Sequence, residues 1–358
     1  MRETTKISIN QKFPSKTIKN DKKLSIQIGN WLEVRKIIKN ISNYPVDDAI
    51  IFFKNVIKKF PKKNQLIYEF ALFYSENNQN IEALEIIEQI DFMKNDYDVV
   101  FLKGLILAKL GNYKKSKKFL EIATKLNPKN PQSYNYLGLT LTDLYELNDA
   151  IKNFNHALEL EENNEFYDNK ARAFYRLGKF DEALKNIDRS LDFDSSNMYS
   201  LIRKGFILQE LEEFQQAKKC FKKILKLKSP YVSFIAIQCR ALIELKMPKE
   251  CIAKADEFLK FNNYQEAVLT DKARSLFLLE KNKIAEEYFR KSIKSNTYPW
   301  ANYYYASFKV SKKDYGGAIK QLVLASKKIP WILEKVNRDP NFKNLINNSD
   351  FCKLVKKY

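Results

Sequence analysis

The chain has 358 residues, of which 63 are Lys or Arg and 43 are Asp or Glu, so its formal net charge is +20. No uncharged apolar run approaches the ~20 residues that a membrane-spanning helix needs, which argues against an integral membrane protein. A single His and four Cys without zinc-ligand spacing argue against a metal site, and only 8 Gly and 10 Pro favour a mainly helical chain.

The first segment, residues 1–29, mixes Lys, Ser, Thr and Asn with few large apolar side chains. We expect a basic, flexible N-terminal arm there. The start of the chain has no apolar signal-peptide core, so a cytoplasmic location is expected.

From residue 30 to residue 329 a small residue returns every 33 or 34 positions. Its nine occurrences are Ala49, Ala83, Ser116, Ala150, Ala183, Ala217, Cys251, Ala285 and Ala318. A fixed period of this length predicts stacked helical hairpins in place of a single globular core.

Each copy contains two amphipathic segments with apolar residues three or four positions apart. In the clearest copy, Tyr134, Leu137-Gly138 and Leu141 precede Ala150, and Phe154 and Ala157 follow it. Small residues allow the two helix backbones to approach closely, and neighbouring hairpins must cover the apolar faces.

This pattern resembles the tetratricopeptide repeat, which has a 34-residue unit with an aromatic residue, Leu-Gly, Ala, an aromatic residue and Ala in similar order. The resemblance implies an all-α, right-handed superhelical solenoid of about nine helix-turn-helix units over residues 30–329. It also implies terminal helices that close the stack, and residues 330–358 fit them. Asp339-Pro340 and Ser349-Asp350 are expected helix starts.

The resemblance further implies that the first helix of each unit lines a concave groove for a peptide or a partner helix. One row, eleven residues before the small position, holds Leu72, Leu105, Leu139, Arg172, Phe206, Arg240 and Arg274. Asn169, Tyr175, Arg176 and Arg203 belong to neighbouring rows. Because guanidinium groups suit carboxylates, this pattern predicts a protein or peptide partner that is acidic or ends in a carboxylate.

One alternative to this peptide site stays open, and one known specificity of the family is not expected. The arginines are equally suited to pair with carboxylates of the groove itself, such as Glu210, Glu244 and Asp271. The chaperone-tail clamp of some tetratricopeptide-repeat proteins is matched only at Asn169 and Arg203, so that specificity is not expected.

Charge supports a second candidate, a nucleic-acid- or ribosome-associated adaptor that uses a lysine-rich convex surface. The resemblance implies that second helices line that outer surface. Residues 131–197 are acidic, whereas second helices before and after them hold lysine runs. The main runs are Lys114-Lys115, Lys117-Lys118, Lys218-Lys219 and Lys222-Lys223. Such runs attract polyanions, but they are also typical of a solvated helix face.

Catalysis is not expected. His156 falls at a variable surface position, and no phosphate-binding glycine loop is present. We therefore predict a non-catalytic scaffold without a cofactor or metal. Cys239 and Cys251 occupy the two positions where the helices of one hairpin touch, and reduced thiols are expected there.

Overall fold

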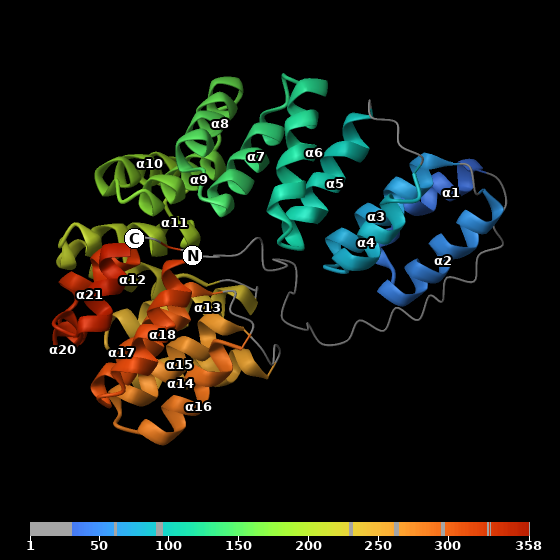
Figure 1. Ribbon diagram of the computed structural model, residues 1–358. Helices are drawn as coiled ribbons and strands as arrows, with labels where there is room; N and C mark the ends of the chain where they lie inside the picture. Colours follow the sequence, from blue (N-terminus) through green and yellow to red (C-terminus); the bar gives the residue numbers. More distant parts are fainter. Residues whose placement is uncertain are drawn as a thin grey trace. The chain divides into compact units, whose positions relative to one another are not determined.

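The computed structural model describes residues 31–60, 63–90, 96–228, 232–260, 265–294, 298–327, 329 and 331–357. All regular secondary structure in these ranges is helical (Figure 1). The predicted arm, residues 1–29, lies outside the described residues. These residues form two compact units that divide between Leu144 and Tyr145. The predicted domain bounds at residues 30 and 330 remain a prediction. Each unit is described by itself.

The N-terminal unit contains the helices up to Leu144. They are α1 (Trp31–Ile38), the 3-10 helix η1 (Ile41–Asn43), α2 (Val46–Lys59), α3 (Asn64–Glu76), α4 (Asn80–Ile87), α5 (Tyr97–Lys109), α6 (Tyr113–Leu126) and α7 (Pro131–Leu144). Two antiparallel pairs, α3 with α4 and α5 with α6, are in close contact, and α7 packs on α6.

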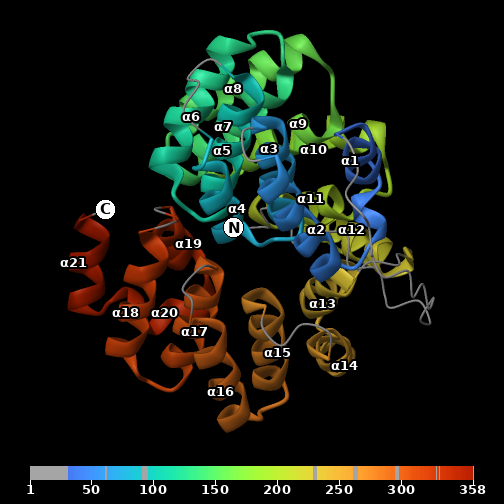
Figure 2. The ribbon, with the colours of Figure 1, turned by 90° about the vertical axis from the view of Figure 1, so that its right-hand side faces the viewer.

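The C-terminal unit continues the same alternation. Its repeat helices are α8 (Leu147–Leu160), α9 (Asn164–Arg176), α10 (Phe180–Phe193), α11 (Met198–Glu210), α12 (Phe214–Lys226), α13 (Val232–Glu244), α14 (Pro248–Leu259), α15 (Glu266–Leu278), α16 (Asn282–Ser292), α17 (Pro299–Ser311) and α18 (Tyr315–Ser326). Figure 2 shows the last of these hairpins, α15 with α16 and α17 with α18, beside one another.

The nine small residues confirm the predicted period. They lie on the second helices α2 to α18, and each is at most 1% exposed. Where the residue is not alanine, its side chain also donates a hydrogen bond to the first helix. Ser116 Oγ bonds the carbonyl of Gly104 at 2.8 Å, and Cys251 Sγ bonds that of Cys239 at 3.3 Å. The predicted cysteine pair is therefore two buried free thiols.

Glycine on the first helix explains how closely the hairpins pack. A Cβ atom added at Gly205 would lie 2.3 Å from the ring of Phe221, and one added at Gly104 would lie 2.9 Å from the side chain of Leu120. Contacts of that length do not occur without displacement, so a larger residue at either position would have to move the facing side chain.

The turns inside eight of the nine hairpins share a second backbone geometry. Five residues before the small position the backbone is left-handed, with φ between 59° and 77°. The eight residues concerned are Asn78, Gly111, Tyr145, Gly178, Glu212, Lys246, Glu280 and Lys313. In seven of these turns the next N–H bonds a carbonyl five residues back, as Lys179 N does to Phe174 O at 3.0 Å. This is the Schellman ending of a helix.

The period stops after α18, as predicted, and short terminal helices follow. They are α19 (Ile332–Arg338), the 3-10 helix η2 (Pro340–Phe342), α20 (Lys343–Ile346) and α21 (Ser349–Lys357). Asp339 caps η2 at the predicted start, whereas α21 is capped by Asn348, one residue before the predicted pair. Phe342 and Phe351 are at most 1% exposed and bury the end of the stack. No helix in the described ranges has the length and apolar character that crossing a bilayer requires.

Candidate functional site

The first helices of the C-terminal unit carry the arginines that the sequence predicted for a peptide groove. Arg172, Phe206, Arg240 and Arg274 occupy one equivalent position on α9, α11, α13 and α15. The structure brings three of them into one cluster, because the Arg240 guanidinium lies 5.9 Å from the Phe206 ring and Arg274 bonds the same carboxylate as Arg240.

The cluster is a set of links between successive first helices, which we call the inter-repeat ladder. Its members are Asp168, Arg203, Gln209, Arg240, Glu244, Asp271, Arg274 and Tyr304. Arg240 Nε lies 2.9 Å from Asp271 Oδ2, and Arg274 Nη1 lies 2.8 Å from Glu244 Oε1, both joining α13 to α15. Gln209 Nε2 donates to Glu244 at 3.0 Å and joins α11 to α13. The Arg274 guanidinium stacks 3.8 Å from the Tyr304 ring on α17.

The ion pairs between α13 and α15 are buried, and burial changes the pKa values of their carboxylates. The Asp271 side chain is 1% exposed, and burial raises its pKa although Arg240 and Arg274 oppose the shift. Burial acts in the same direction on Glu244, but the charge of Arg274 and hydrogen bonds from Gln209 and Arg274 outweigh it, so the pKa of Glu244 is lowered. The two arginines and two carboxylates balance in charge. A carboxylate ligand would have to replace an internal partner.

Arg203, the residue shared with the chaperone-tail clamp, is also paired with a carboxylate of the chain. Its Nε and Nη2 donate to the two carboxylate oxygens of Asp168 on α9, each at 3.0 Å. Asn169, Arg172 and Arg176 are each less than 9% exposed. Arg203, Arg240 and Arg274 therefore pair with carboxylates of the chain itself, which was the alternative to a peptide site. Their predicted role in binding an acidic peptide remains a prediction, with desolvation and lost ion pairs against it.

Residues after the last repeat cover the remaining part of this row. The Trp331 ring meets those of Tyr175 and Phe180 edge to face, with centroids 5.4 and 6.1 Å apart. On the next turn, Lys335 Nζ lies 2.5 Å from Glu210 Oε1, on α11 and 125 residues earlier in the chain. Tyr175 also donates to Glu210, at 3.3 Å.

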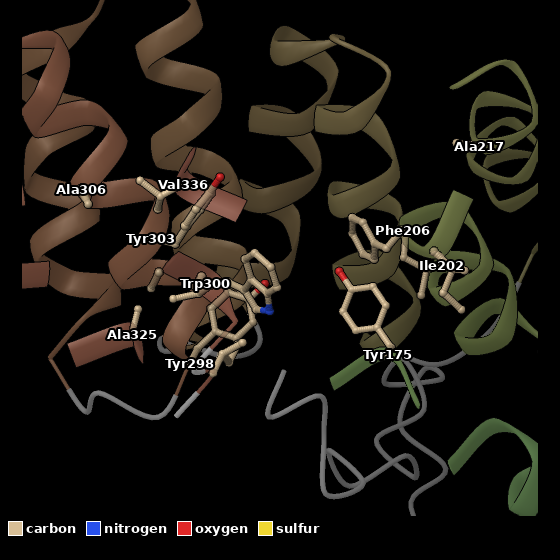
Figure 3. Packing of buried hydrophobic residues seen from close by; sticks show 14 of the residues in the cluster. Tyr175, Ile202, Phe206, Ala217, Tyr298, Trp300, Tyr303, Ala306, Ala325 and Val336 are labelled. Carbon is tan, nitrogen blue, oxygen red and sulfur yellow. The ribbon is translucent and has the colours of Figure 1, made fainter. Parts of the chain in front are cut away.

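The apolar side of α19 completes this closure. Ile332 and Val336 are fully buried in the same core as Tyr175 and Phe206. Figure 3 shows Tyr175 and Phe206 from the earlier repeats close to Tyr298 and Trp300 from the last one. The first-helix face from α9 to α11 is therefore filled by α19 and by Trp331, the residue before it. Sequence reasoning missed Lys335 because α19 lies outside the repeat period.

The N-terminal unit presents a different first-helix face. Each of α3, α5 and α7 carries a partly exposed aromatic residue followed, one turn later, by a partly exposed leucine. These residues are Tyr68 and Leu72, Phe101 and Leu105, and Tyr136 and Leu139, and we call them the aromatic–leucine face. The rings of Phe101 and Tyr136 meet edge to face at 5.7 Å, which links α5 to α7.

Other candidate residues from the sequence form no reactive site in the described residues. His156 is exposed and lies 3.1 Å from the Glu159 carboxylate, one turn away on α8. Among the residues that the structure describes, no three His, Cys, Asp or Glu side chains converge as a metal site would require.

Comparison with known proteins agrees with the repeat. A family model described as "Tetratricopeptide repeat" matches residues 97–130 and 199–231. The chain is 26% identical over 145 residues to an N-terminal acetyltransferase A complex subunit-like protein of Schizosaccharomyces pombe, covering 40% of this chain and 21% of that one. It is 26% identical over 142 residues to the Hsp70-Hsp90 organizing protein of Triticum aestivum, covering 37% and 24%. The chain thus spans about a quarter or less of these relatives.

Among solved structures, the APC/C hetero-tetramer Cut9-Hcn1 aligns with a TM-score of 0.49 at 14% identity, covering 73% of this chain and 56% of that one. MamA from Desulfovibrio magneticus aligns with a TM-score of 0.43 at 18% identity, covering 46% and 95%.

Proposed function

Because this chain is a tetratricopeptide-repeat protein, we propose that it is a non-catalytic scaffold that binds a polypeptide partner on the aromatic–leucine face of α3, α5 and α7. The observation that carries the proposal is the contrast between its two units. In the C-terminal unit the first-helix row is occupied by the inter-repeat ladder and by α19. In the N-terminal unit the equivalent row is three partly exposed leucines with aromatic neighbours.

The chemistry of this face suits polypeptide binding. Aromatic side chains at the centre of an interface supply much of its affinity when a partner excludes water from them. The leucines add apolar area whose removal from water also favours binding. The side chains stand on rigid, packed helices, so little conformational entropy is lost when a partner binds.

Binding of amphipathic helical peptides to the full-length chain tests the proposal. The variant Leu105→Glu places a charge at the centre of the face and is expected to abolish binding. The matched variant Ile81→Glu, at a residue on α4 that is 64% exposed, is expected to bind as the unmodified chain does. Equal binding by both variants would rule out this face.

One observation favours a second candidate, a nucleic-acid-associated adaptor. Lysines on α12 and just after it are exposed, and none forms an ion pair with a carboxylate in the described part of the chain: Lys218, Lys219, Lys222, Lys223, Lys226 and Lys228. RNA binding that weakens steeply with salt and is lost in Lys218→Glu with Lys222→Glu would support this candidate. RNA binding unchanged in that variant would exclude α12.

A further inference from the structure

The charge around the aromatic–leucine face is opposite to the charge of the whole chain. Although the net charge is +20, neither α3 nor α7 contains a Lys or Arg. Acidic residues border the face instead: Glu69 and Glu76 on α3, with Asp96 and Asp98 at the start of α5. In this unit lysines are more frequent on the second helices α2 and α6 than on the first helices α3, α5 and α7.

The two lysines of α5 compensate these acids only in part. The charge of Lys109 lowers the pKa of Glu76, but burial raises it more strongly. Lys109 Nζ donates to both the carbonyl and the hydroxyl of Ser75, each at 2.8 Å. Lys103 lies 5.1 Å from the ring of Phe119 on α6 and 3.4 Å from Glu88 at the end of α4. Each contact fixes its ammonium group on a neighbouring element.

The acids act on the face itself. Tyr68 is one of its aromatic residues, and burial together with the charges of Asp98, Glu69, Asp96 and Glu76 raises the pKa of this phenol to about 12. The negative potential therefore reaches the apolar side chains that a partner would touch.

From these observations we infer that the aromatic–leucine face binds a basic amphipathic helix, with its apolar side on Tyr68, Leu72, Phe101, Leu105, Tyr136 and Leu139 and its Lys or Arg residues beside Glu69, Glu76 and Asp98. This inference rests on the proposed function and adds the partner's chemistry. Three neighbouring helices 8–10 Å apart span about 20 Å, which a helix of about 14 residues covers at 1.5 Å per residue. Complementary charge would speed association and select against acidic helices.

The C-terminal unit contains an internal example of such recognition. Trp331, the N-cap residue of α19, contacts the ring of Tyr175 on the first helix α9. Lys335, four positions later on α19, contacts the carboxylate of Glu210 on the first helix α11. Both contacts are made from one side of a short helix.

Two designed 16-residue peptides test the inference against the full-length chain by fluorescence anisotropy in 50 mM NaCl. Both carry the same Leu and Phe positions on one helical side, and their flanking positions are Lys in one peptide and Glu in the other. We expect the Lys peptide to bind at least tenfold more tightly. The double variant Glu69→Lys with Glu76→Lys is expected to reduce Lys-peptide binding at least tenfold.

The matched control reverses two acids on a second helix, Glu82→Lys with Glu85→Lys on α4, and changes the net charge equally. It should change Lys-peptide binding less than twofold. Equal binding of both peptides, with Leu105→Glu abolishing both, would overturn the inference and leave the proposed function standing. Failure of both peptides to bind would overturn both. An equal loss in the control would also reject local complementarity, because it would show an effect of net charge.

Discussion

The inter-repeat ladder makes a sharp prediction at Arg240, which the sequence assigned to a ligand. Replacing Arg240 with Met removes the partner of Asp271, whose side chain is 1% exposed. Breaking a buried pair by removing one partner costs about 3–5 kcal/mol, since the other charge stays buried. Arg274 Nη1, 3.5 Å from Asp271 Oδ1, retains part of the compensation. We therefore expect the free energy of unfolding to fall by about 3 kcal/mol, toward the lower end of that range.

Urea unfolding of the full-length chain, followed by circular dichroism at pH 7, measures this change. The matched control is Arg290→Met, which breaks an ion pair of 2.7 Å to Glu286 whose arginine side chain is 68% exposed. Exposed pairs contribute about 0.2–1 kcal/mol. The double variant Arg240→Met with Asp271→Asn removes both charges and should regain much of the loss. If Arg240→Met and Arg290→Met were equally stable, the structural role of the ladder would be refuted.

Three further changes are expected from the fold. Gly205→Ala should destabilise the chain by about 1–2 kcal/mol in urea unfolding, because overpacking against the buried Phe221 ring exceeds the gain in helix propensity; an unchanged midpoint would contradict the close helix crossing. Glu280→Gly should stabilise the chain by about 0.5–1 kcal/mol, because a left-handed conformation is unfavourable for a residue with a Cβ atom. Gly178→Ala should destabilise it by about the same amount for the same reason. Shifts of the same sign in the two variants would contradict the turn geometry. The pKa of Glu244 is lower in the folded chain than in the unfolded chain. The ionised carboxylate therefore stabilises the fold above the pKa of the unfolded state, and this stabilisation is lost as pH falls through the pKa of the folded state. Glu244→Gln should therefore make the loss of unfolding free energy from pH 5 to pH 3 shallower, and an identical slope would count against the assigned protonation.

The repeat was predictable from sequence because it depends on local contacts. A small residue such as Ala217 packs against the first helix of its own hairpin, about twelve residues earlier in the chain. Every copy of the repeat therefore has a small residue at this position. The left-handed turns were only partly visible, since six of the eight are not glycine and the neighbouring helices impose the conformation. Periodicity also could not choose among carboxylate partners. It placed Glu210 near the arginines, but Lys335 binds it from outside the repeat.

The net charge of the chain also differs in sign from the charge beside the aromatic–leucine face. A net charge of +20 and a row of arginines favoured an acidic partner. In the folded chain Arg203, Arg240 and Arg274 pair with Asp168, Asp271 and Glu244 respectively. Exposed lysines lie on the second helix α12. The partly exposed apolar side chains of α3, α5 and α7 are bordered by acids instead. A partner attracted by the whole chain and a partner attracted by this face would therefore carry opposite charges. Binding measured with matched Lys and Glu peptides separates the two, because only local complementarity favours the basic peptide on a basic protein.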